Sequence, residues 1–301
     1  MNKHIPFVLG LSLAVAGSTM AAAQQESPTT GSVPKVLQIT REFVKPGKSG
    51  AIHDKSESAF VQAMARAKSP THYIALSSLS GKSRALYLTG YDSFEAWEKD
   101  NKSVEKNAAL AAELDRAMVA DGELLDSLDQ MVYSYEDDLS YRAHGDLAHA
   151  RYMEASVYHV RPGHAREWRA LVKMVIEANQ KAGTSAHWAM FHLAYGGRGG
   201  TYVLFSADKS LAEIDTGFKE SKQFRDALGE DGMKKLSELL ASSVDESEDQ
   251  LFAINPHQSY VADEWIKADP DFWKPKAVAA PAAKPAAKAA AKTVAEKKTT
   301  P

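Results

Sequence analysis

The stretch that decides the fold is "VYHVRPGHAREW", Val157–Trp168, together with its counterpart "REFVKPGKSGAI", Arg41–Ile52. In each stretch an alternating run ends, a Pro-Gly pair follows, and the apolar residues then take up helical spacing. Proline fixes φ and glycine tolerates a left-handed backbone, so both stretches predict a strand that leads into a helix within a few residues. The histidines of one copy are missing from the other. We therefore interpret the shared motif as architecture rather than chemistry.

Further similarities indicate an internal repeat. Pro46 and Pro162 lie 116 residues apart, "THYIALSSLSG" from Thr71 resembles "AHWAMFHLAYG" from Ala186, and "SLDQMV" resembles "SEDQLF" at a similar offset. These matches predict one unit of about 105 to 110 residues that occurs twice. The predicted organisation is a signal peptide (1–23), a flexible segment (24–34), a first repeat (35–141), a linker (142–150), a second repeat (151–262), a C-terminal extension (263–273) and a basic tail (274–301).

Each unit has a readable order of elements. "KVLQITREFV" and "RYMEASVYHV" alternate with period two and predict strands. Further strands are expected at 72–79, 84–91, 187–194 and 201–206, with helical stretches after them and a last strand at "DQMVYSYE" or "DQLFAIN". The expected buried face of the first helix is Ile52, Ala59, Phe60, Ala63, Met64 and Ala67, and that of its counterpart is Trp168, Leu171, Val172, Val175 and Ala182.

The order βαββ, helices, β resembles the ferredoxin-like subunit of the dimeric α/β-barrel superfamily, which includes antibiotic-biosynthesis-monooxygenase-like and NIPSNAP-like domains. The resemblance covers residues 35 to 260 and implies an α+β fold. Two tandem units would form a pseudo-dimeric α/β barrel within one chain, since each copy covers a sheet face that the other leaves bare. The resemblance leaves the oligomeric state open, because a pseudo-dimer within one chain needs no second copy to complete the barrel and can be a monomer.

The two faces of the first strand in each unit differ in polarity. Leu37, Ile39 and Phe43, with their counterparts Met153, Ala155 and Val157, are expected under the helices. The polar face is expected to point into the interior and bind a ligand, with contributions from two second-strand residues. The predicted ligand-binding residues are Gln38, Thr40, Glu42, Tyr73, Ser156, Tyr158 and Trp188. A strand whose polar face meets only solvent would show the same pattern.

His192 and Glu154 are the candidate catalytic residues. An imidazole with a pKa near neutrality can accept a proton from a bound substrate, and a neighbouring carboxylate can set its tautomer. The alternative is that His192 only forms a hydrogen bond at the strand surface. The sequence contains no cysteine, and His144 and His149 lie in a linker without a pattern suited to a metal, so we predict no metal site and no cofactor.

The ends of the chain point to export. Lys3, the apolar run "IPFVLGLSLAVAG" and the small residues before Gln24 predict a signal peptide cleaved near Ala23, with export to the periplasm or the exterior. The tail carries seven Lys and one Glu, which leaves a net charge of −10 on residues 24–273. An acidic body argues against nucleic-acid binding. No later segment is long and apolar enough to span a membrane.

Three functions fit these observations. The first is an exported protein that binds a small molecule in the interior of the duplicated barrel. The second, implied by the resemblance, is a cofactor-independent monooxygenase or isomerase that uses His192 as its base. The third is a non-catalytic envelope protein that docks on an anionic surface through its basic tail.

Overall fold

The computed structural model describes residues 33–274. The predicted signal peptide, all but the last two residues of the flexible segment and all but the first residue of the basic tail lie outside the described residues. Eight strands are present in this part of the chain: β1 (Val36–Val44), β2 (Tyr73–Ser78), β3 (Arg84–Tyr91), β4 (Leu125–Tyr135), β5 (Tyr152–Val160), β6 (Ala189–Tyr195), β7 (Thr201–Asp208) and β8 (Val244–Ile254).

Between residues 33 and 274 the structure contains seven α-helices and two short 3₁₀ turns. The helices are α1 (Ala51–Ala67), α2 (Phe94–Lys106), α3 (Ala108–Gly122), α4 (Ala165–Ala182), α5 (Leu211–Ser243), α6 (Asp263–Ala268) and α7 (Pro270–Trp273). The 3₁₀ turns are Asp137–Leu139 and Leu147–His149. The mixed α+β class that the sequence predicts is confirmed.

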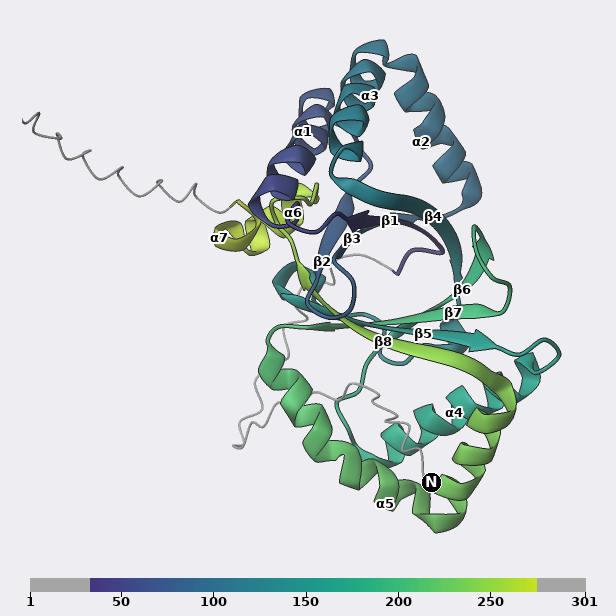
Figure 1. Ribbon diagram of the computed structural model, residues 1–301. Helices are drawn as coiled ribbons and strands as arrows, with labels where there is room; N and C mark the ends of the chain where they lie inside the picture. The colour runs from purple at the N-terminus through teal and green to yellow at the C-terminus, as the bar shows by residue number, and fades with distance from the viewer. Residues whose placement is uncertain (1–32, 275–301) are drawn as a thin grey trace, which may run out of the picture.

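All eight strands form one antiparallel sheet that closes on itself, in the order β1-β3-β2-β8-β5-β7-β6-β4 and back to β1. The first four strands and the last four form two halves, which meet where β2 pairs with β8 and β4 pairs with β6. Helices α1 to α3 cover the outer face of the first half, and α4 and α5 cover that of the second (Figure 1). The sheet therefore has two buried faces, an interior and an outer face under the helices.

The interior of the closed sheet holds a large apolar core built by both halves. It includes Leu37 and Ile39 of β1, Met153 and Ala155 of β5, and Phe252 of β8. The expectation that this apolar set packs under the helices is wrong. The outward set of β1 begins with Val36, which packs against Ala96 and Trp97 on α2, and strand alternation places Gln38, Thr40 and Glu42 on that same outer face.

The same correction holds for the second half. Tyr158 packs on Trp168 of α4 with ring centroids 4.9 Å apart, so Glu154 and Ser156, which share its parity, also face outward. The physical reason is that period-two alternation marks two different faces without saying which one is inside. Here the apolar sets of both halves pack against each other, and the polar set lies under the helices.

Helix α4 buries the face that the sequence predicts, because Trp168, Leu171, Val172 and Val175 are all buried. Helix α1 does not. Its buried residues are His53, Glu57 and Ala63, whereas Ile52 is 51% exposed. A buried polar cluster sets the face of α1, and a search for apolar residues at helical spacing misses such a face.

Several irregular features recur at matching places in the two halves. The pairing of β1 with β4 shifts between Phe43 and Val44, and that of β5 with β8 shifts between His159 and Val160. The Pro-Gly turns follow, with φ of 78° at Gly47 and 86° at Gly163. Helices α1 and α4 each end on a left-handed residue, Lys68 and Gly183. The halves differ later, since α2 and α3 correspond to the single helix α5, kinked at Gly229.

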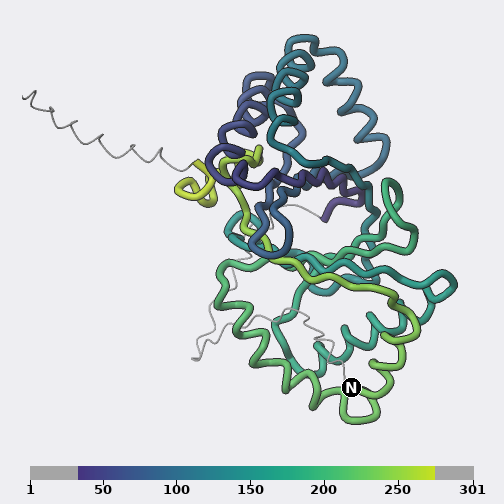
Figure 2. The backbone as a smooth tube through the Cα atoms, in the orientation of Figure 1, coloured from purple at the N-terminus to yellow at the C-terminus, as the bar shows by residue number. Residues whose placement is uncertain are grey.

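The chain returns from β8 to the first half, where the C-terminal extension lies near α1 (Figure 2). The Gln258 side chain contacts His53 and Asp54, and Tyr260 donates a hydrogen bond to the carbonyl of Ser69. Trp273 is buried and donates its indole hydrogen to the carbonyl of Ala148. No helix within residues 33–274 is both long and apolar enough to cross a membrane.

Candidate functional site

A cavity of about 540 Å³ occupies one end of the closed sheet's interior. Its walls come from both halves, from the linker and from the C-terminal extension. Most of the wall is apolar, and part of it belongs to the interior core: Leu37, Ile74, Leu88, Met153, Ala189, Phe191, Phe205 and Ala207. Val261, which precedes the extension, and Trp265, which belongs to it, complete the wall. A largely apolar cavity of this volume suits a small organic molecule.

Three histidines line the cavity among these apolar residues. His72 stacks on Tyr260 at 4.9 Å, and the Nε2 atom of His187 lies 2.9 Å from the carbonyl oxygen of Ala207. His144, which is exposed, contributes from the linker. The Nδ1 atom of His187 also faces a backbone carbonyl, that of Ser185, so both of its ring nitrogens are occupied. His72 and His144 can form hydrogen bonds with a polar end of a ligand whose body lies in the apolar part.

Two of the predicted ligand-binding residues border the cavity. Tyr73 and Trp188 both line it, although the indole of Trp188 turns outward and donates a hydrogen bond to the carbonyl of Leu139. The remaining five do not line the cavity, and their predicted place in the interior is wrong. They are Gln38, Thr40, Glu42, Ser156 and Tyr158. Their role as contacts of a small-molecule ligand stays a prediction, and the 540 Å³ cavity does not support it.

The two predicted catalytic residues are not brought together. His192 stands opposite Tyr202 on β7, and its ring stacks on that of Tyr202 with centroids 4.4 Å apart. Glu154 stands opposite Ser206, four residues further along the same strand, a separation of about 13 Å along the strand. The carboxylate that approaches His192 is Glu136, 3.9 Å from its Nδ1 atom. The geometry therefore gives no support to proton transfer by a His192–Glu154 pair.

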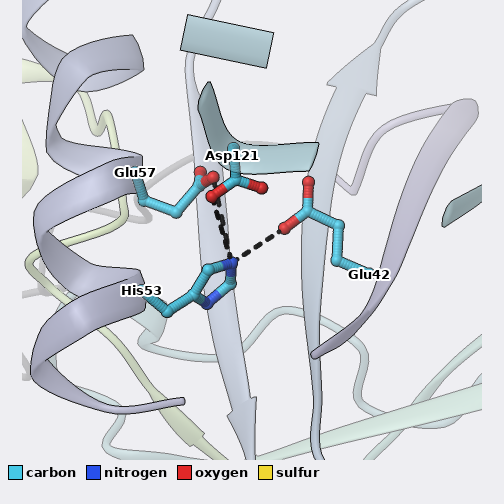
Figure 3. Close-up of side chains that lie close together, drawn as sticks. All are labelled: Glu42, His53, Glu57 and Asp121. Atoms are coloured by element: carbon cyan, nitrogen blue, oxygen red, sulfur yellow. Dashed lines mark hydrogen bonds and ion pairs between the residues drawn. The ribbon is translucent and has the colours of Figure 1, made fainter. Parts of the chain in front are cut away.

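A second constellation lies under the helices of the first half. His53 and Glu57 project from one face of α1 toward Glu42 on β1 and Asp121 near the end of α3 (Figure 3). The Nε2 atom of His53 lies 3.1 Å from Glu42 Oε2, 3.6 Å from Asp121 Oδ1 and 4.0 Å from Glu57 Oε1. The four residues, which we name the His53 cluster, are between 1% and 5% exposed.

Burial and charge act together on the ionisable groups of the His53 cluster. Burial lowers the pKa of His53, but Asp121 and Glu42 outweigh it and raise this pKa to about 10. Burial, followed by the charges of Glu42 and Asp121, raises the pKa of Glu57 to about 9. Burial also opposes ionisation of Asp121, but His53 holds its pKa below the usual value. At neutral pH the cluster thus contains an imidazolium, a protonated Glu57 and an ionised Asp121.

The His53 cluster was only partly visible in the sequence. The strand pattern points to Glu42, although for the interior, and not to His53, Glu57 or Asp121. The available signal is the spacing of His53 and Glu57, four residues apart on a predicted helix, which puts both on one face. Asp121 lies 64 residues beyond Glu57, and only the packing of α3 against α1 brings it near.

Comparisons with known proteins find distant structural likenesses only. No protein family description matches the chain, and neither does any curated protein. A candidate monooxygenase of Fusobacterium nucleatum shares 12% identity over 74% of this chain and 93% of its own, with a TM-score of 0.49. An anthrone oxidase-like protein shares 14% identity over 76% of this chain and 94% of its own, with a TM-score of 0.48. A mutant chlorite dismutase of Candidatus Nitrospira defluvii shares 10% identity over 79% of this chain and 96% of its own, with a TM-score of 0.46.

All three structures have TM-scores below 0.5. At such identities and scores they carry no information on what this chain binds or whether it catalyses a reaction.

Proposed function

We propose that this chain is an exported protein that binds a small, largely apolar molecule in the cavity at the end of the closed sheet. The observation that carries the proposal is the cavity itself, about 540 Å³ in volume and lined by both halves. Small-molecule sites are typically apolar clefts of about 300 to 1,000 Å³ with a few polar groups. The ligand would have an apolar body and one polar or anionic group, which His72 would receive.

The proposal includes an origin for the cavity, in which two tandem ferredoxin-like units form a pseudo-dimeric barrel. The strand irregularities after Phe43 and His159 and the left-handed caps at Lys68 and Gly183 recur at offsets of 116 and 115, close to the 116 between the two prolines. Export rests on residues 1–23 of the sequence alone. Amino-terminal sequencing of the protein from an envelope fraction tests it, with Gln24 as the expected first residue.

The binding test is a titration of the mature protein with the fluorescent probe 1-anilinonaphthalene-8-sulfonate, which has an apolar body and one anionic group. We expect saturable binding of one probe per chain. Ala189→Phe and Ala207→Phe place a phenyl ring in the cavity and should weaken binding at least about tenfold, a loss of about 1.4 kcal/mol. The matched control is Ala112→Phe on the exposed surface of α3, which should bind like the wild type.

Two results would count against the proposal. One is the absence of saturable binding to the wild type. The other is equal binding by all three variants, which would place the probe outside the cavity. Thermal unfolding of each variant confirms that any loss of binding occurs in folded protein.

A further inference from the structure

We propose that the His53 cluster is a binding site for one divalent transition-metal ion, with His53 Nε2 and carboxylate oxygens of Glu42, Glu57 and Asp121 as ligands. Binding of the ion displaces the protons that His53 and Glu57 carry in the metal-free cluster and releases them to solvent. The site is separate from the cavity, because the cluster lies on the outer face of the sheet under α1 and α3. The proposal does not depend on the proposed function.

The four candidate ligand atoms lie almost as close together as the ligands of a single metal ion do. The four ligand atoms all lie within 4.8 Å of one another, and those nearest His53 Nε2 are 3.1 and 3.6 Å away. Ligands about 2.0 to 2.1 Å from a tetrahedral metal ion are about 3.4 Å apart. Small side-chain movements therefore suffice to place all four around one ion.

The carboxylates have oxygen atoms to spare for a metal ion. Glu57 Oε1 and both carboxylate oxygens of Asp121 are buried without a hydrogen-bond partner among residues 33–274. Figure 3 shows the Asp121 carboxylate directed at the other three side chains. The charge of Asp121 is offset only by His53, whose Nε2 atom lies 3.6 Å from Oδ1, beyond hydrogen-bond distance. A bound cation in contact with these oxygens would satisfy them directly. Asp121 also lies in the last turn of α3, where the helix dipole disfavours a negative charge.

The second half of the molecule serves as an internal control. Tyr158 takes the place of Glu42, since each lies two residues before the strand irregularity. Trp168 and Val172 stand 15 and 11 residues before the left-handed cap of α4, as His53 and Glu57 do before that of α1.

Asp121 has its own counterpart in the second half. It lies four residues before Leu125, which pairs with Val44, just as Leu240 lies four before Val244, which pairs with Val160. Tyr158, Trp168, Val172 and Leu240 all belong to one apolar core. The fold can therefore pack this position with apolar side chains alone. The four ionisable side chains at the same position in the first half are not needed for packing, which favours a binding role for them.

The donor set limits the choice of metal. Imidazole suits Zn²⁺ and carboxylates suit Mn²⁺, so a site with one nitrogen and three carboxylates fits either ion better than Cu(I), which prefers sulfur.

The test measures binding of Zn²⁺ and of Mn²⁺ to the mature, untagged chain after removal of metal with a chelator. Because the four side chains are buried and an ion from solvent has no open path to them, each ion is supplied both to folded protein and during refolding from urea. We expect one tightly held equivalent of at least one ion per chain. Asp121→Asn should weaken binding more than about 100-fold, since even outer partners of a ligand contribute about 10- to 100-fold.

Glu57→Gln provides a second variant that keeps the side-chain shape and should also weaken binding at least about tenfold. It decides the question if Asp121→Asn does not fold. The control is Asp115→Asn, an exposed carboxylate on the same helix as Asp121, which should bind like the wild type. The proposal is overturned if neither ion binds stoichiometrically after refolding, or if Glu57→Gln binds as tightly as Asp115→Asn.

Discussion

Single side chains in the His53 cluster should differ sharply in their effect on stability. In metal-free protein at pH 7, Asp121→Asn removes one of the two carboxyl groups that stabilise the His53 imidazolium and leaves only Glu42, so it should lower the free energy of unfolding by about 2 to 3 kcal/mol. Glu57→Gln should cost less than about 1 kcal/mol, because burial and its neighbours raise the pKa of Glu57 to about 9 and the group is already neutral. Urea unfolding with a chelator present measures both, and equal costs would contradict this account of the charges.

Glu154 should make stability depend on pH. Burial, followed by the charges of Asp208 and Asp249, raises its pKa to about 7, from 4.5. The folded chain thus holds a proton that the unfolded chain releases, so this contribution is full below pH 4.5 and is lost as pH rises through 7. The loss is about 3 kcal/mol. Glu154→Gln should remove that part of the decline between pH 5 and pH 8 in urea unfolding, whereas the exposed Glu246→Gln should not.

Among the elements, the ends of α1 and α4 offer a matched pair of substitutions. Both end on a left-handed residue, with φ of 50° at Lys68 and 64° at Gly183. A side chain at such a position costs about 1 kcal/mol that glycine avoids. Lys68→Gly should therefore stabilise the protein by up to that amount, and Gly183→Ala should destabilise it by a similar amount. A shift of the two melting temperatures in the same direction would show that the caps do not control these ends.

The elements also show what can be derived from the sequence. The strand periods, the Pro-Gly turns and the apolar face of α4 are local patterns, and each is found where it was predicted. The sequence of β1 alone does not determine which of its faces points inward. Ile39 on one face and Glu42 on the other are both buried, and the elements that pack on each face decide which is the interior. The His53 cluster escaped prediction for the same reason, since its members come from β1, α1 and α3.

For the whole molecule, the interior core requires both halves. The core is shared, and closure depends on β2 pairing with β8 and β4 pairing with β6. A protease site inserted between His144 and Gly145 should allow cleavage of the linker without separating the halves. Size-exclusion chromatography should then find both fragments in one species, with the circular dichroism of the intact chain. Two folded fragments that elute apart would show that each half is an independent domain.

Bound metal should add to the stability of the whole chain. An ion present at 100 times its dissociation constant stabilises the folded state by about 2.7 kcal/mol, provided that it does not bind the unfolded chain. The melting temperature of the wild type should rise with Zn²⁺ or Mn²⁺, and that of Glu57→Gln should rise less at the same concentration. Equal shifts in the two proteins would assign the effect to other surface groups.

Native mass spectrometry of the mature protein from its envelope fraction measures directly whether the interior cavity holds a small molecule. We expect a wild-type chain that carries one non-covalent adduct of small-molecule mass, released at higher collision energy. Ala207→Phe, with its cavity filled, should lack that adduct, and Ala112→Phe should retain it. A wild type without any adduct that also fails to bind added apolar ligands, or an adduct that persists in Ala207→Phe, would contradict the proposed binding.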